Sequence, residues 1–257
     1  STHDIINGID LAADIINYKY DLDIPFASET GIKSQKKKIK IIYKDFGDNR
    51  EKVNQLVDEL VKFDKVDIIC GCYFSNATSF ASERADLYNI PFFTFNSTVP
   101  ILTRKGLKNF YRTTPDDEIF TANFFEYLKE ISTEYQFPKR IILVYENSFW
   151  GTGVAQAETR QAKLNGYEIV SEISYDSFRP NSFRFADQIK KAMPAIIMQA
   201  SYDQDAIEWM RTYKNNDINP IAILAMNAGF TSSSFIDSLR ADGNFIITRE
   251  TWAKDLT

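Results

Sequence analysis

The chain has 257 residues, of which 44% are hydrophobic and 25% are charged, and its formal net charge is -5. These proportions are those of an ordinary globular protein, and the length is sufficient for two domains. The acidic balance excludes the basic face that general nucleic-acid binding requires. No stretch of the sequence approaches the roughly 18 consecutive apolar residues of a membrane-spanning helix.

The first predicted elements are a helix, a strand and a second helix. Apolar residues at helical spacing predict helices over residues 4–17 and 53–61, and an apolar run predicts a strand over residues 39–43. No strand pattern precedes the first helix, and no helix follows the last strand. We therefore expect a fragment or a trimmed chain.

Residues 68–103 form the unit around which the prediction is organised. An apolar run ends at Gly71, polar residues and a helical pattern follow, and a second apolar run over 90–95 ends in Asn96-Ser97-Thr98. The pattern predicts strand, polar turn, helix, strand and a second polar turn. A short apolar passage at 110–112 comes next, and Thr114 and Pro115 then have the residue types of an N-cap and a first helical position for a helix ending near Ile131.

A second block of alternating elements follows Pro138. Strands are predicted at 140–145, 168–174, 195–199, 221–225 and 244–248, with helices between them at 151–165, 181–192, 203–213 and 232–239. Alternation of strand and helix at this rhythm predicts an α/β fold with parallel, doubly wound sheets. The two blocks, before and after about residue 114, predict two lobes.

Polar and aromatic residues follow several of the predicted strands. In open parallel sheets, ligands bind beyond the carboxyl ends of the strands, and the N–H groups of helix starts favour carboxylates there. Any one such residue is more simply a cap or a turn residue, but five groups split between two blocks favour a shared cleft. The groups are Tyr73-Phe74-Ser75, Asn96-Ser97-Thr98, Trp150, Ser201-Tyr202-Asp203 and Asn227-Ala228-Gly229.

Catalytic, metal and cofactor patterns are absent from the sequence. His3 is the one histidine, and Gly151-Thr152-Gly153 is followed by Gln156 where a dinucleotide loop would need its third glycine. Cys70 and Cys72 are too close for a comfortable disulfide and have no further ligands for a metal. We expect no enzyme, no cofactor and no metal site.

At this point the chain resembles the type I periplasmic binding proteins, and among them the leucine/isoleucine/valine-binding group of ABC transporter receptors. The resemblance rests on the motifs at residues 71–75, 90–103, 110–116 and 145–153, which occur in the family's order. It implies two lobes joined by a hinge, with lobe 1 at 1–114, lobe 2 at 115–248 and the start of a hinge return at 249–257. It also implies closure of the lobes over a small solute.

The same resemblance implies roles for individual residues. Ser75 matches the hydroxyl that grips a ligand carboxylate, and Asn96 and Thr98 match the pair whose backbone and hydroxyl complete this grip. We assign Ser97, between them, to the same site. Trp150 matches an aromatic lid and Tyr202 a tyrosine of the second lobe. We also assign Tyr73 to the ligand-binding site, and Tyr18 as a further aromatic wall of that site.

Two departures from the family pattern concern the ligand and a disulfide. Amino-acid binders of this group hold the ligand ammonium with an acidic residue where this chain has Asn227, and a charge-assisted bond lost there is worth roughly 1.5–3 kcal/mol. Asp203 is a candidate substitute. The ligand is therefore an amino acid, or a carboxylate or amide without the ammonium. The family's disulfide is also missing, since Phe74 and Asn49 occupy the corresponding region.

The functional hypothesis is a monomeric, extracytoplasmic solute receptor, periplasmic or membrane-anchored outside the cell. Its partners would be a small-molecule solute and the membrane permease of an ABC transporter, with no nucleic acid. The alternative is the ligand-sensing domain of a signalling receptor, which a transmembrane segment in the full-length chain would indicate. An enzyme on the same α/β plan would require turnover that disappears on Ser75→Ala.

Overall fold

The computed structural model describes residues 2–32, 37–47 and 49–250. The chain divides into two compact units, residues 1–47 and 48–257, and each is described by itself. Among the described residues, no helix combines the length and the apolar character needed to cross a membrane.

The first unit contains helix α1 (Thr2–Asn17) and the irregular segment that follows it. The helix confirms the prediction over 4–17, but the predicted strand over 39–43 is wrong. The side chain of Asn17 accepts a hydrogen bond from Ile39 N at 2.6 Å and donates one to Ile39 O at 2.7 Å. Tyr43 donates its hydroxyl to Asp10 at 2.7 Å. The backbone of Ile39 is thus paired with a side chain rather than with a neighbouring strand.

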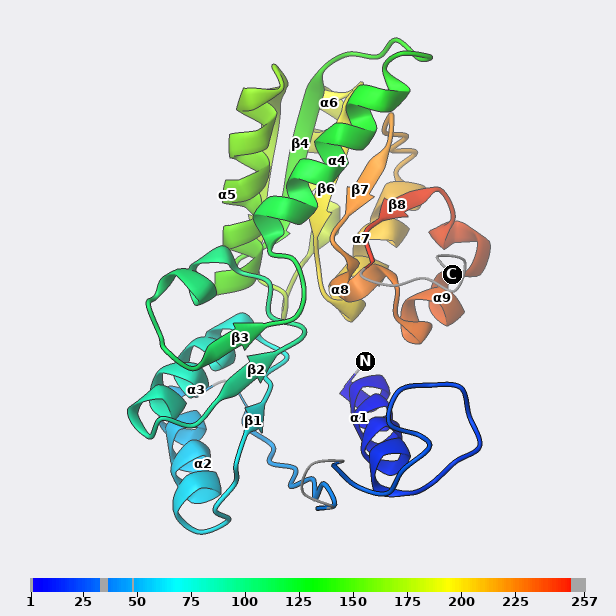
Figure 1. The fold of residues 1–257 in the computed structure, drawn as a ribbon. Helices are drawn as coiled ribbons and strands as arrows, with labels where there is room; N and C mark the ends of the chain where they lie inside the picture. The colour runs from blue at the N-terminus through cyan, green and yellow to red at the C-terminus, as the bar shows by residue number, and fades with distance from the viewer. Residues whose placement is uncertain (1, 33–36, 48, 251–257) are drawn as a thin grey trace. The chain divides into compact units, whose positions relative to one another are not determined.

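The second unit begins with a small parallel sheet. Strands β1 (Ile69–Cys70), β2 (Phe92–Thr94) and β3 (Phe110–Arg112) pair in that order (Figure 1). Helices α2 (Arg50–Lys62) and α3 (Ser75–Leu87) pack together, and a 3-10 turn, η1, spans Pro100–Arg104. Helix α2 begins where Asn49 accepts hydrogen bonds from the amides of Glu51 and Lys52. This arrangement confirms the predicted strand-helix-strand unit.

A larger parallel sheet with five strands occupies the rest of the described chain. Its order is β5-β4-β6-β7-β8, and every neighbouring pair is parallel. The strands are β4 (Arg140–Glu146), β5 (Glu168–Tyr175), β6 (Ile196–Ala200), β7 (Ile223–Ala225) and β8 (Ile246–Thr248). The helices are α4 (Asp117–Ile131), α5 (Phe149–Leu164), α6 (Ala186–Ala192), α7 (Asp203–Asn215), α8 (Asn227–Phe230) and α9 (Ser233–Leu239).

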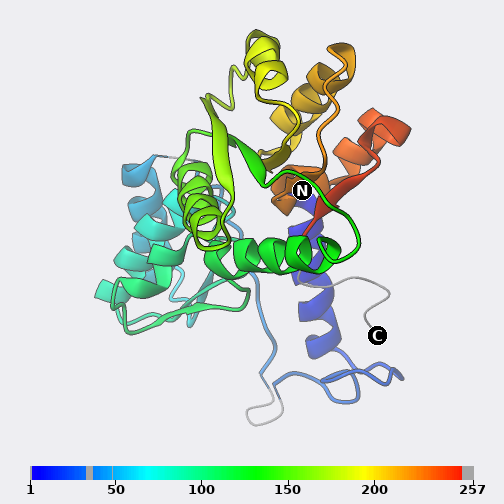
Figure 2. The same cartoon turned by 90° about the horizontal axis from the view of Figure 1, so that it is seen from above.

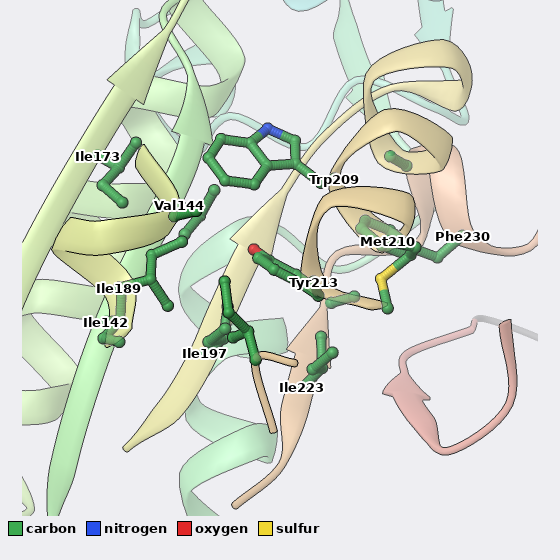
Figure 3. Packing of buried hydrophobic residues seen from close by; sticks show 14 of the residues in the cluster. Ile142, Val144, Ile173, Ile189, Ile197, Trp209, Met210, Tyr213, Ile223 and Phe230 are labelled. Atoms are coloured by element: carbon green, nitrogen blue, oxygen red, sulfur yellow. The ribbon is translucent and has the colours of Figure 1, made fainter. Parts of the chain in front are cut away.

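The larger sheet is covered on both faces because its strands are apolar on both faces. Ile141 and Leu143 of β4 join the core formed with α4 and α5, whereas Ile142 and Val144 join the core formed with α6 and α7. Figure 2 shows these helix pairs on opposite sides of the sheet. Figure 3 shows the second core, in which Trp209 and residues from the sheet and the helices pack together. Continuous apolar runs are typical of parallel strands buried on both sides.

Several helix boundaries differ from the prediction. Asp116, not Thr114, is the N-cap of α4, and its carboxylate accepts a hydrogen bond from Ile119 N at 3.1 Å. Helix α5 begins two residues earlier than predicted because Ser148 caps it through Trp150 N. The helix predicted over 181–192 is divided into the 3-10 turn η2 (Ser182–Phe185) and α6. A further 3-10 turn, η3, spans Arg240–Gly243.

The expected lobes stay a prediction. The smaller sheet ends at Arg112 and the larger one begins at Arg140, on either side of the expected boundary near residue 114. Residues 251–257 of the expected hinge return lie outside the described residues.

Candidate ligand-binding site

The turn after β1 leads directly into α3. Ser75 is the first residue of this helix, and its side chain is 3% exposed. The N-cap residue, Phe74, supplies no side-chain hydrogen bond to the first amides. This helix start therefore presents the Ser75 hydroxyl and the first backbone N–H groups, of which that of Ala77 donates to Asn76 Oδ1 at 2.8 Å.

The turn after β2 is tied to the turn after β1 by buried hydroxyls. Ser97 and Thr78 share a hydrogen bond of 2.6 Å, and Ser97 also donates to Cys72 O at 3.1 Å. Thr78 accepts a hydrogen bond from Cys72 N at 2.9 Å. Ser97 thus fixes the two turns together. The neighbouring Asn96 is half-buried, and its side chain makes no hydrogen bond to another described residue.

A hydrogen bond joins the smaller sheet's second turn to the larger sheet. Trp150, in the first turn of α5, donates its Nε1–H to Thr98 Oγ1 at 3.2 Å. Both side chains are buried, with 5% and 3% exposed. The bond brings together two predicted site residues that are 52 positions apart in the chain.

Glu146, which the sequence reasoning missed, holds the turn that carries Trp150. It ends β4, is fully buried, and accepts hydrogen bonds from Ser148 N at 2.7 Å, Ser148 Oγ at 2.5 Å and Gly151 N at 2.9 Å. Burial raises the pKa of Glu146, and these bonds act in the opposite direction. A Cβ at Gly151 would lie 2.6 Å from Glu146 Oε1 and closer still to the Glu146 carbonyl oxygen, so the closeness of this residue requires the glycine. The sequence pattern that could have indicated this role is a glutamate at the end of a strand, five residues before a glycine.

Tyr202 lies at the centre of an aromatic cluster. Its ring centroid is 4.9 Å from that of Trp150, 6.0 Å from that of Tyr73 and 5.4 Å from that of Phe74. Burial, and then the charges of Asp203 and Asp205, raise the pKa of Tyr73 to about 12. Tyr73, Phe74, Trp150 and Tyr202 are referred to below as the aromatic cluster. Phe74 was not assigned to the site from the sequence, although it stands between Tyr73 and Ser75.

The two acids at the start of α7 have different surroundings. Asp203 accepts a hydrogen bond from Ser234 Oγ at 3.3 Å, so its carboxylate is partnered by α9. Asp205 is 2% exposed and accepts a hydrogen bond from Tyr175 OH at 2.6 Å, and burial raises its pKa to about 6. The structure therefore partners both carboxylates within the larger sheet's own layers.

Two further predicted residues are placed only in part. Asn227 begins α8, and its backbone lies in the turn after β7. That turn approaches the turn after β6, since a Cβ at Gly229 would lie 2.5 Å from the carbonyl carbon of Tyr202. Tyr18 belongs to the unit formed by residues 1–47, where Lys38 Nζ lies 4.1 Å from the centroid of its ring. The assignment of Tyr18 to the site stays a prediction.

Among the described residues, no group of His, Cys, Asp and Glu side chains is arranged to hold a metal ion. Cys70 and Cys72 are both free. The arrangement offers hydrogen-bond donors, hydroxyls and aromatic faces, which are the elements of non-covalent small-molecule recognition.

Comparison with known proteins identifies the family of the chain. A family model described as periplasmic binding protein matches residues 2–257. Leu/Ile/Val-binding protein homolog 7 of Brucella abortus is 24% identical over 216 residues, which are 81% of this chain and 53% of the relative. Homolog 8 of the same organism is 26% identical over 239 residues, which are 91% of this chain and 56% of the relative. The chain thus spans about half the length of the curated relatives it matches.

Solved structures share the fold. A branched-chain amino acid transporter substrate binding protein from Streptococcus pneumoniae, in complex with isoleucine, has a TM-score of 0.68 at 19% identity over 93% of this chain and 60% of that one. A solute binding protein of an ABC transporter from Rhodopseudomonas palustris, in complex with 3,4-dihydroxy benzoic acid, has a TM-score of 0.66 at 18% identity over 75% of this chain and 52% of that one. The two parallel α/β sheets are thus those of the type I periplasmic binding fold, as predicted. Because the family model matches nearly the whole sequence, the chain belongs to the periplasmic binding protein family.

Proposed function

We propose that this chain forms the ligand-capturing core of an ABC transporter solute-binding protein, in which a small carboxylate-bearing solute binds between the two sheets. The observation that carries the proposal is the meeting of strand-end turns from both sheets. Trp150 of the larger sheet bonds to Thr98 of the smaller one, and Tyr202 contacts Tyr73. Ligands of open parallel sheets bind at such carboxyl ends.

The carboxylate would be held at the start of α3. Ser75 supplies a buried hydroxyl at the first position of the helix, and the N-cap residue, Phe74, gives the first amides no side-chain cap, although the amide of Ala77 donates to Asn76 Oδ1 at 2.8 Å. Free N–H groups and the positive end of the helix dipole favour an anion at this position. Asn96 and Thr98 would complete the grip from the second turn, while Ser97 positions both turns through its bonds to Thr78 and Cys72.

The rest of the ligand would lie against the aromatic cluster. The four aromatic rings favour a ligand whose remaining part is apolar or aromatic, because the faces and edges of the rings can contact it. Asn227 has no carboxylate with which to bind a ligand ammonium. The nearby carboxylates of Asp203 and Asp205 already accept hydrogen bonds from Ser234 and Tyr175, respectively. We therefore propose that the ligand is an aromatic or apolar carboxylate rather than an amino acid or an amide. The ligands named for the two solved structures, isoleucine and 3,4-dihydroxy benzoic acid, both carry a carboxyl group.

The proposed mechanism is closure of two lobes about a hinge, in which the ligand binds the closed state better than the open one. The family is one of solute binders rather than enzymes and works outside the cytoplasm. We propose a periplasmic or membrane-anchored extracellular monomer that delivers its solute to a membrane permease.

A calorimetric titration of the protein with benzoate, isoleucine and benzamide tests the proposal. Benzoate should bind more tightly than benzamide, because only the former presents a carboxylate. Ser75→Ala should weaken benzoate binding about tenfold, since a hydrogen bond to a charged group contributes about 1.5 kcal/mol. The matched control is Ser132→Ala, which removes an exposed hydroxyl at the end of α4. Equal affinities in the two variants, or no binding of any of the three compounds, would contradict the proposal.

A further inference from the structure

Two acidic side chains are buried together between α4 and α5. Asp117 is 0% exposed and Glu158 is 1% exposed, and none of their four carboxyl oxygens has a hydrogen-bond partner among the described residues. The charge of Asp117 acts on Glu158 and adds to the effect of burial, which raises the pKa of Glu158 well above its ordinary value. Thr121, one helical turn after Asp117, also has a buried hydroxyl without a described partner. Asp117 and Glu158 are referred to below as the acid pair.

The positive charges around the acid pair are few. Arg249 Nη2 lies 3.9 Å from Asp117 Oδ1, and its guanidinium stacks over the ring of Phe120, 3.6 Å from the centroid. Glu250, beside Arg249 in the chain, also acts on that guanidinium. Arg112 is also near Asp117, but its guanidinium is paired with Asp116 at 3.2 Å.

The surroundings of the two acids differ in a way that decides which one is charged. Thr98 and Trp150 lie close enough to Asp117 to lower its pKa, as does Arg249, although burial dominates and raises it to about 6. Burial raises the pKa of Glu158, and among the described residues the charged group that acts on it is Asp117, which is of the same sign. Two ionised carboxylates buried against one guanidinium would leave an uncompensated charge in a low-dielectric interior. A single proton removes that charge.

We propose that the acid pair is a proton-binding site, in which Glu158 is held as the neutral acid at neutral pH while Asp117 carries the charge that pairs with Arg249. The site joins several parts of the fold. Asp117 N donates to Thr98 O at 3.0 Å, and Thr98 accepts the bond from Trp150. Arg249 follows β8 directly. Loss of the proton would place two like charges beside the connection from the smaller sheet and beside the segment that leaves β8.

Comparison of Glu158→Gln with Asp117→Asn tests the assignment, because the amide is an isostere of the neutral acid. Urea unfolding should give Glu158→Gln and the wild type the same unfolding constant near pH 4. Above the ordinary Glu pKa of 4.5, the wild type should become tenfold less stable per pH unit relative to this variant, since only the wild type must keep a proton that its unfolded chain releases. Asp117→Asn should unfold much more readily than Glu158→Gln at pH 7, because it leaves Arg249 buried without its counterion. Glu130→Gln, an exposed acid of α4, should follow the wild-type pH dependence.

Infrared spectroscopy supplies a readout on the wild-type protein that does not depend on any variant's folding. The carbonyl stretch of a protonated carboxyl should be present at pH 7, retained in Glu130→Gln and diminished in Glu158→Gln. Absence of the band, or equal destabilisation by Glu158→Gln and Asp117→Asn, would overturn the proposal. A third result would also overturn it. If sodium stabilised the wild type more than a bulky organic cation did at equal ionic strength, and this difference disappeared in Glu158→Gln, a metal cation rather than a proton would occupy the site.

Discussion

Gly151→Ala should destabilise the protein by disrupting the turn that carries Trp150. A methyl group at this position would lie 2.6 Å from Glu146 Oε1 and closer still to the Glu146 carbonyl oxygen. The carbonyl cannot move readily, because β4 is paired with β5 on one side and β6 on the other. The first turn of α5 must therefore shift, and the bond from Gly151 N to Glu146 is lost.

The magnitude follows from two contributions. Overpacking of a buried site costs about 1–3 kcal/mol, and loss of a hydrogen bond to a carboxylate costs about 1.5–3 kcal/mol. We expect a total of about 2.5–6 kcal/mol. Urea unfolding followed by tryptophan fluorescence measures it, and the slope of the transition should not change.

Gly153→Ala is the matched control, two residues further along the same helix. A Cβ there would lie 3.5 Å from Val99 Cγ1, which is an ordinary contact. Alanine is also the better helix former, so this variant should be more stable than the wild type by about 0.5–1 kcal/mol. If Gly151→Ala were as stable as Gly153→Ala, the reasoning about the Glu146 turn would be refuted.

Three further variants test other parts of the site. Trp150→Phe removes the donor to Thr98 and should lower the free energy of unfolding by about 1 kcal/mol, whereas an unchanged value would mean that the bond contributes nothing. Gly229→Ala should cost about 1–3 kcal/mol and change the near-ultraviolet circular dichroism, because the methyl group would lie 2.5 Å from the Tyr202 carbonyl carbon. Burial raises the pKa of Asp205 to about 6, so its contribution to stability is complete below pH 4 and is lost as the pH rises to 6. That loss should be roughly 3 kcal/mol in the wild type and absent in Asp205→Asn, as measured by unfolding at several pH values.

The alternation of strands and helices was predictable because apolar periodicity and burial agree in this fold. Strand β4 is buried at almost every position, and its sequence is correspondingly a continuous apolar run. The segment 39–43 is also mostly apolar, with Lys40 as its one charged residue, yet Asn17 satisfies the backbone of Ile39. A distant side chain of this kind leaves no trace in local periodicity. The start of α4 was misplaced because two neighbouring positions, Thr114 and Asp116, both have cap chemistry.

The proximity of four candidate site residues was predictable from their places at strand ends. Thr98, Trp150, Tyr202 and Tyr73 follow strands of parallel sheets, and the structure brings their side chains into contact. Their roles toward a ligand remain predictions.

The buried acids were not predictable from the sequence. Glu146 and Glu158 read as polar residues at a strand end and on a helix, and only packing of the layers reveals that both are enclosed.

A crystal structure of the protein with a bound carboxylate tests the central claim most directly. The account predicts a carboxylate oxygen within hydrogen-bond distance of Ser75 Oγ and the first amides of α3, with the body of the ligand against Trp150 and Tyr202. A ligand bound away from these turns, or bound here with its carboxylate directed toward solvent, would contradict it.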